Sequence, residues 1–174
     1  DLIVYNKYPE VYDQQLGIIS WSIPDITAIT PIEGKTVVDA GAGTGRLAFL
    51  VAPLAGTVFA VEPVTSLRRF IQEKAARERI NNLFVMDGFL DSIPLPADSV
   101  DILMTSNAIG WNLEGELKEI ERLLKPRAYA IHLIQSDAQT ENRLHEMLVT
   151  PPWNYTCLES ALDGGLKLKY FKTF

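Results

Sequence analysis

The chain has 174 residues with 47% hydrophobic content and a formal net charge of −6, which fits one domain with a sizeable core and disfavours a broad phosphate-neutralising surface. One cysteine and two histidines exclude an internal disulfide and disfavour a zinc cluster, so we expect no metal. No apolar run reaches the ~20 residues that span a bilayer and no signal peptide opens the chain, so we expect a cytoplasmic protein without a membrane or nucleic-acid partner.

Residues 1–33 precede the first expected strand and are rich in aromatic side chains. We expect one helix over about 10–20 and another around 24–29, because Pro9 and Pro24 suit first-turn positions. One interpretation is that the aromatic residues, Trp21 among them, pack against the edge of a sheet. A turn at 31–35 then leads into the first strand.

A glycine-rich turn follows the first apolar run, which begins at Val37. Gly41, Gly43 and Gly45 permit positive φ and leave no side chain between the backbone and a ligand. A helix, expected to run to about residue 54, begins directly afterwards, so its unpaired N–H groups face whatever binds there. This order of strand, loop and helix predicts a nucleoside-like ligand. A tight turn without a ligand is the alternative.

The second expected strand, residues 57–61, ends in an acid and a proline, Glu62-Pro63. Glu62 lies about where dinucleotide folds place the acid that binds ribose, on the order of 20 residues beyond the glycine loop. A carboxylate accepts hydrogen bonds from both vicinal hydroxyls of any adenosine cofactor. A solvated turn acid is the alternative interpretation of Glu62.

Two further strands are expected at 83–86 and 100–105, separated from the second strand by a helix over 66–79. The segment 91–101 contains two prolines and is predicted to be a rigid loop. Ligands of open α/β sheets bind beyond the carboxyl ends of the strands, so Asn107 and Trp111 are substrate-side candidates. Each could instead cap or pack against the following helix.

The last third of the chain is expected to complete the sheet. A helix over 114–124 precedes a strand over 128–134, in which His132 is better explained as a core histidine than as a catalytic base. Another helix, 138–148, follows. Two β-prone runs, 155–162 and 166–174, are joined by Asp163-Gly164-Gly165, which predicts an antiparallel hairpin.

The glycine loop does not match two familiar phosphate-binding patterns. Arg46 occupies the last glycine position of a dinucleotide fingerprint, and the Gly-Lys-Ser/Thr of a P-loop is absent. Residues 38–46 read Val-Asp-Ala-Gly-Ala-Gly-Thr-Gly-Arg, which resembles the first motif of class I S-adenosylmethionine-dependent methyltransferases. The segments 61–63, 91–101 and 121–126 are also similar to that family. The resemblance covers about residues 33–136, and the hairpin extends it to the end.

The resemblance implies an α/β fold: a Rossmann-like three-layer αβα sandwich around a seven-stranded, mostly parallel sheet of order 3-2-1-4-5-7-6 with an antiparallel terminal hairpin. It implies a single domain over 1–174, with 1–33 as a helical lid and 34–174 as the core. It also implies S-adenosylmethionine as the cofactor. Tyr12, in the leading segment, becomes a third substrate-side candidate.

The resemblance also assigns roles to individual residues. The loop holds the methionine end of the cofactor, with the acid Asp39 helping to fix the loop and the amino group. Glu62 binds the ribose, and Asp87 accepts from the adenine amino group, although a plain Asp-Gly turn is a serious alternative. The implied cofactor-binding residues are Asp39, Gly41, Ala42, Gly43, Glu62, Pro63, Asp87, Gly88, Phe89 and Asn107.

The implied activity is methyl transfer to an unidentified acceptor, by default a small molecule, with a protein or peptide substrate as another option. The Asn/Asp-Pro-Pro-Tyr motif of members that modify adenine or glutamine is absent, because residues 105–109 read Thr-Ser-Asn-Ala-Ile. No general base stands out. One alternative is a silent, methyltransferase-like partner subunit. A nicotinamide-dependent oxidoreductase is less favoured, because Arg46 and the antiparallel tail argue against it.

Overall fold

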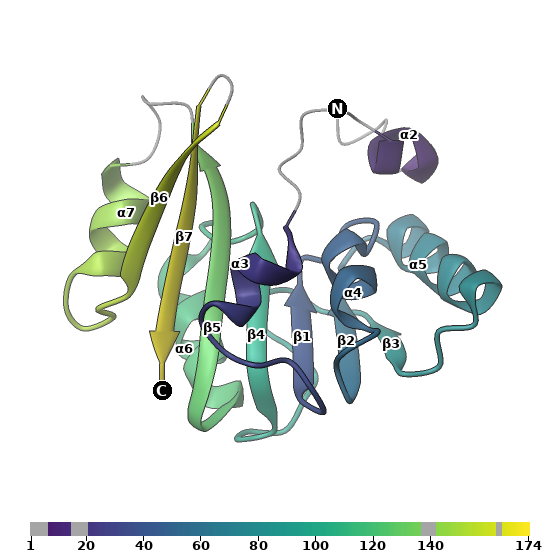
Figure 1. The fold of residues 1–174 in the computed structure, drawn as a ribbon, viewed down its shortest axis with the longest axis horizontal. Helices are drawn as coiled ribbons and strands as arrows, with labels where there is room; N and C mark the ends of the chain where they lie inside the picture. Colours follow the sequence, from purple (N-terminus) through teal and green to yellow (C-terminus); the bar gives the residue numbers. More distant parts are fainter. Residues whose placement is uncertain (1–6, 15–20, 137–141, 163–164) are drawn as a thin grey trace.

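A computed structural model describes residues 7–14, 21–136, 142–162 and 165–174. Its sheet has the order β3-β2-β1-β4-β5-β7-β6. Strands β1 to β5 are parallel, whereas β7 pairs antiparallel with both β5 and β6 (Figure 1). The predicted topology is therefore confirmed. The strands are β1 (Thr36–Ala40), β2 (Thr57–Val61), β3 (Leu83–Met86), β4 (Val100–Ser106), β5 (Leu124–Ser136), β6 (Thr156–Leu162) and β7 (Gly165–Thr173).

The helices are α2 (Pro9–Gln14), α3 (Ile23–Thr27), α4 (Arg46–Val51), α5 (Thr65–Glu78), α6 (Leu113–Leu123) and α7 (Asn142–Val149). The helix expected over 10–20 is described only as far as Gln14, and residues 138–141 of another expected helix also lie outside the described ranges. Helix α4 ends at Val51, which is earlier than predicted, and a turn over residues 52–54 follows it. Within the described ranges, no helix has the length and apolar character needed to cross a membrane.

The start of β5 differs from the sequence prediction. Helix α6 ends at Leu123 and β5 begins at the next residue, four positions earlier than the expected strand. Pro126 disfavours helical backbone at Lys125, so the helix cannot continue past this point. The register then jumps, since Val100 pairs with Leu124 but Ile102 pairs with Tyr129. An irregular stretch around Pro126 therefore joins the helix to the regular strand.

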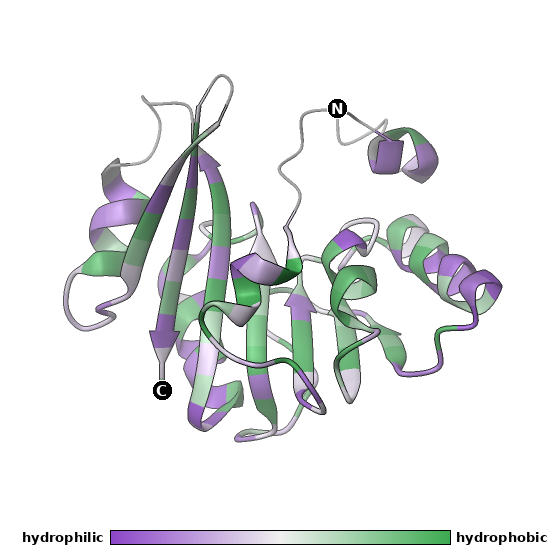
Figure 2. Cartoon of the chain, viewed as in Figure 1, coloured by the Kyte–Doolittle hydropathy of each residue, from purple (hydrophilic) through white to green (hydrophobic). Residues whose placement is uncertain are grey.

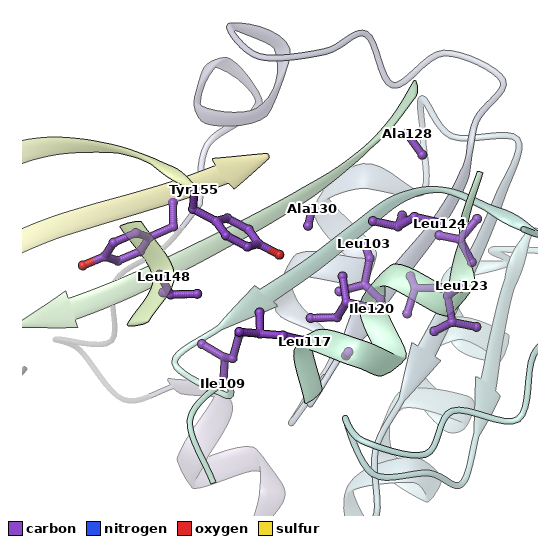
Figure 3. Packing of buried hydrophobic residues seen from close by; sticks show 14 of the residues in the cluster. Leu103, Ile109, Leu117, Ile120, Leu123, Leu124, Ala128, Ala130, Leu148 and Tyr155 are labelled. Carbon is purple, nitrogen blue, oxygen red and sulfur yellow. The ribbon is translucent and has the colours of Figure 1, made fainter. Parts of the chain in front are cut away.

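The sheet is covered on both faces, which gives the three layers. Neighbouring strand residues point to opposite faces, so Val37 and Val38 belong to two separate hydrophobic clusters. One cluster includes residues of α3, α4 and α5, and the other includes residues of α6 and α7. Figure 2 shows hydrophobic and hydrophilic residues alternating along α5. Figure 3 shows Leu117, Ile120 and Leu123 of α6 directed toward the sheet, where each buried side chain contributes about 1.5–3 kcal/mol.

Residues 21–33 are part of the packed structure. Ile26 and Ile32 are fully buried in the same cluster as residues of β1 and β5. Asp25 forms an ion pair with Lys167 at 2.7 Å, which connects α3 to β7. Burial acts to raise the pKa of Asp25, but hydrogen bonds from Lys167 and Ser22 outweigh it and lower the pKa to about 2. A lid role therefore stays a prediction for the segment before residue 21.

Candidate cofactor site

A cavity of about 1030 Å³ lies at the carboxyl ends of the parallel strands. Its walls come from the segments that follow β1, β2, β3 and β4, together with Trp21 and parts of α4, α5 and α6. Small-molecule sites occupy roughly 300–1,000 Å³, so the cavity is at the large end of that range. This position is where open α/β sheets bind ligands.

The loop after β1 brings bare backbone to the cavity wall. Gly41, Gly43 and Gly45 have φ of 72°, 57° and 79°, a region that favours glycine. Gly41 N and Ala42 N donate to the carbonyl oxygen of Val61, at 2.9 and 3.0 Å, so the loop is fastened to the end of β2. A Cβ atom on Gly41 would overlap the side chain of Ala108. The loop therefore has no space for a side chain at its first glycine.

Asp39, at the end of β1, anchors the helix that follows the loop. It is buried, and its Oδ2 accepts a hydrogen bond from Ala48 N at 3.0 Å. Burial raises the pKa of Asp39 to about 7; the bond from Ala48 opposes this rise and the nearby Glu62 adds to it. The carboxyl of Asp39 thus holds β1 and α4 together beside the cavity.

Glu62 links the glycine loop to the end of β2. Its Oε2 accepts from Gly43 N and its Oε1 accepts from Val64 N, both at 2.9 Å. Burial raises the pKa of Glu62, while the hydrogen bonds from Val64 and Gly43 act to lower it. Each carboxylate oxygen accepts more than one hydrogen bond. Glu62 therefore supports the loop and still has acceptor capacity toward the cavity.

Most of the residues assigned from the sequence lie together. The cavity is lined by Asp39, Gly41, Ala42, Gly43, Glu62, Pro63, Gly88, Phe89, Asn107 and Trp111. Tyr12 belongs to α2, but its side chain is outside the part of the chain that the structure describes.

Asp87 is the exception, because it is not among the residues that line the cavity. Its side chain is 69% exposed and its Oδ1 lies 3.1 Å from Arg68 Nη1. The same Arg68 nitrogen donates to the carbonyl oxygen of Glu62 at 2.8 Å. Arg68, in α5, thus pairs with the carboxylate that the resemblance assigns to the adenine amino group. An adenine contact for Asp87 stays a prediction that this arrangement does not support.

Three lining residues that the sequence analysis did not assign have polar atoms without a partner. The described residues include four buried side-chain atoms with no hydrogen bond: Asp13 Oδ1, Trp21 Nε1, Thr44 Oγ1 and Arg46 Nη1. Trp21, Thr44 and Arg46 all line the cavity. Unpaired buried donors are costly, at roughly 1–3 kcal/mol each. All three residues belong to the cavity wall, but these particular atoms are covered by protein.

The loop after β4 is held by a buried acid that the sequence analysis also missed. The carboxylate of Glu116, in α6, accepts from the backbone N–H groups of Gly110, Trp111 and Asn112 at 2.7, 3.0 and 3.0 Å. The Oδ1 of Asn107 accepts from Gln135 N at 2.7 Å, which connects this loop to β5. Trp111 and Asn107 are therefore presented on a fixed backbone.

His132 is a core histidine, as the sequence predicts. It is fully buried, and burial lowers its pKa to about 3. Its Nδ1 lies 2.9 Å from Thr105 Oγ1 and its Nε2 lies 3.4 Å from the hydroxyl of Tyr155. The cavity wall does not include it. A neutral, hydrogen-bonded imidazole at this place stabilises the fold.

Comparisons with known proteins agree with this geometry. A family model described as methyltransferase domain matches residues 38–132. An uncharacterized methyltransferase of Geobacillus sp. (strain WCH70) is 27% identical over 106 residues, which are 60% of this chain and 47% of the relative. The chain spans about half the length of the curated relatives it matches.

Solved structures share the fold. A SAM-dependent methyltransferase from Aquifex aeolicus has a TM-score of 0.68 at 18% identity, with 85% of this chain and 86% of that chain covered. Phosphoethanolamine N-methyltransferase 1 of Haemonchus contortus, solved with phosphoethanolamine and S-adenosylhomocysteine, has a TM-score of 0.63 at 16% identity, with 86% and 41% covered. With the family model matching more than half of its residues, the chain belongs to the methyltransferase domain family, whose class I members use S-adenosylmethionine.

Proposed function

We propose that the cavity binds S-adenosylmethionine and that the chain transfers its methyl group to a small-molecule acceptor. The observation that carries this proposal is the cavity of about 1030 Å³ at the carboxyl ends of the parallel strands, whose wall includes the glycine loop and Glu62. Gly41 and Gly43 in that wall have no side chain that would keep a ligand away from the backbone. Thr44 and Arg46 also line the cavity, and a hydroxyl and a guanidinium suit the carboxylate at the amino-acid end of the cofactor.

The remaining walls suit the other parts of such a ligand. Glu62 offers acceptor oxygens to ribose hydroxyls, and Asp39 holds in place the helix that follows the loop. Val64, Leu67 and Leu90 supply apolar surface for a flat base. Bound there, S-adenosylmethionine supplies a methyl group on a positively charged sulfur. The protein contributes chiefly orientation, which accounts for much of the rate in reactions between positioned groups.

A small-molecule acceptor is supported by the size of the cavity, which is large for one ligand. The Haemonchus contortus neighbour was solved with the small molecule phosphoethanolamine. A protein or peptide acceptor and a silent partner subunit are the alternatives, and a cytoplasmic location stays a prediction. Parts of a longer protein can add to the acceptor site, because the chain spans about half the length of its curated relatives.

Isothermal titration calorimetry tests the cofactor site. We expect one S-adenosylhomocysteine to bind per chain, and Glu62→Ala to weaken binding by about 1–3 kcal/mol, the loss typical of hydrogen bonds to a charged group. Glu114→Ala is the matched control, because that acid pairs with Lys118 on the exposed surface of α6 and is not among the lining residues. An unchanged affinity in Glu62→Ala removes Glu62 from the site. Tight binding of NAD alone contradicts the proposal.

A further inference from the structure

Two loops form one connected rim beside the cofactor site. Phe89 and Asp91 come from the segment after β3, and Trp111 and Asn112 come from the segment after β4. The Asn112 Nδ2 donates to Asp91 Oδ2 at 2.8 Å, which joins the two loops. All four residues line the cavity, and Phe89 is one of those that the family resemblance assigns to the cofactor. We call this set the acceptor rim.

The acceptor rim carries the two most exposed large hydrophobic side chains of the described residues. Trp111 is 89% exposed and Phe89 is 64% exposed. The backbone of Trp111 is fixed, because Glu116 accepts hydrogen bonds from it and from both of its neighbours. Exposed aromatic surface beside a cavity marks a place where a ligand binds. An uncovered indole on a fixed backbone offers its face to a ligand.

The charges of the cavity wall restrict what that ligand can be. Asp91 is the charged residue of the acceptor rim, whereas Asp39, Glu62 and Arg46 belong to the proposed cofactor side and the carboxylate of Glu116 is hydrogen-bonded to three backbone N–H groups. The whole chain has a formal net charge of −6. An acceptor with a phosphate or carboxylate would therefore meet Asp91 and no described cation at the rim. A cationic group is favoured by both Asp91 and the aromatic faces, since cations are attracted to aromatic rings.

The kinds of side chain in the wall also restrict the reaction. The described lining residues include no histidine, lysine, cysteine or tyrosine. Methylation of a hydroxyl or an unactivated carbon needs a base to take the proton before or during transfer. An amine carries its own lone pair once it has lost a proton to water. Among the described lining residues the groups that can act as a base are carboxylates, and an amine that has lost its proton to water needs none of them.

We propose that the acceptor is an amine, held by the faces of Trp111 and Phe89 with Asp91 beside it, an inference that rests on the proposed function. The ammonium form binds to the acceptor rim and loses one proton to solvent. The neutral nitrogen then forms a bond to the methyl carbon while the carbon–sulfur bond breaks. The sulfur keeps the electron pair and becomes a neutral thioether, and the nitrogen takes the positive charge. Atoms and charge balance without an oxidant or a metal.

The binding test uses protein loaded with S-adenosylhomocysteine and two probes of nearly equal shape, choline and the neutral 3,3-dimethylbutan-1-ol. We expect calorimetry to detect choline binding and little binding of the neutral probe. Trp111→Ala should weaken choline binding roughly 3- to 30-fold, the range of cation–aromatic attraction, and Trp111→Phe should retain part of it. Phe84→Ala is the control, because Phe84 is a half-exposed aromatic residue on β3 that does not line the cavity.

The turnover test measures S-adenosylhomocysteine formed from S-adenosylmethionine with 2-phenylethylamine, 2-phenylethanol or 3-phenylpropanoate. Turnover with the amine and choline binding that depends on Trp111 support the inference. Equal binding of the two shape-matched probes, or turnover only with the alcohol, overturns it while leaving the cofactor site intact. If S-adenosylhomocysteine itself does not bind, the proposed function fails, and the amine inference fails with it.

Discussion

The two sides of the cavity are built differently. On the side of β1 and β2, backbone groups and two buried acids form the wall, and each acid is hydrogen-bonded to the loop or helix that it supports. On the side of β3 and β4, exposed side chains project from loops, and Trp111 is largely uncovered. Backbone geometry suits a ligand that is the same throughout a family, whereas loop side chains can change with the acceptor. In our proposal the first side binds the cofactor and the second side selects the acceptor.

The largest expected effect is on the backbone side. Gly41→Val should abolish binding of S-adenosylhomocysteine, because Gly41 has φ of 72° and an added side chain overlaps Ala108. Strain and overpacking together cost roughly 3 kcal/mol or more. Gly34→Val is the matched control, since Gly34 has φ of 71° with nothing within 4 Å of an added Cβ. Circular dichroism checks that both variants fold. Retained affinity in Gly41→Val contradicts the loop assignment.

A second expected effect is a pH dependence of stability that comes from the buried Asp39. The pKa of Asp39 is raised to about 7 in the folded chain, whereas an unfolded aspartate has a pKa near 3.9. Between these values the folded state holds a proton that the unfolded state has released, so the free energy of unfolding falls as pH rises from about 4 to 7. We expect a loss of a few kcal/mol over this range, on the order of 1.4 kcal/mol per pKa unit.

Urea denaturation of the ligand-free protein at several pH values measures this dependence. Asp39→Asn cannot ionise, so its stability should change less between pH 4 and pH 7 than that of the unchanged chain. Equal pH dependence in the two proteins shows that Asp39 is not the group responsible. The comparison also isolates Asp39 from Glu62, because the variant leaves Glu62 in place.

The smallest expected effect is at Asp87. Its exposed carboxylate pairs with Arg68, so Asp87→Ala should change S-adenosylhomocysteine affinity by less than about 0.5 kcal/mol, as is usual for exposed ion pairs. Glu62→Ala, measured in the same titration, shows how much affinity is lost when a residue that lines the cavity is replaced. A loss of about 1–3 kcal/mol in Asp87→Ala would instead restore the adenine contact that the family resemblance implies.

The sequence predicted which residues come together on the backbone side of the cavity, because the signals for them are local. The three glycines, Asp39 and Glu62 stand at fixed distances from strands that hydrophobic runs identify. It predicted the other side less well. The pairing of Asp87 depends on Arg68, which comes from a helix 19 residues earlier. Nothing in the local pattern around Asp87 shows that a guanidinium lies beside it.

The contacts of Glu116 and Trp21 were also not predicted, because they too depend on residues that only the fold brings together. Glu116 looks like an ordinary first-turn acid, and its role appears only when the loop before α6 folds back to place three N–H groups around it. Trp21 was recognised as an aromatic residue that packs, but its unpaired Nε1 becomes apparent only beside the cavity. Element boundaries also shifted where tertiary pairing decided them, as at the start of β5.

A crystal structure of the chain with S-adenosylhomocysteine tests the cofactor site most directly. The proposed arrangement predicts the ligand against the glycine loop, with its carboxylate near Arg46 and Thr44, its ribose hydroxyls on Glu62 and its sulfur facing Trp111. A ligand bound elsewhere on the chain, or one whose ribose does not contact Glu62, would contradict it.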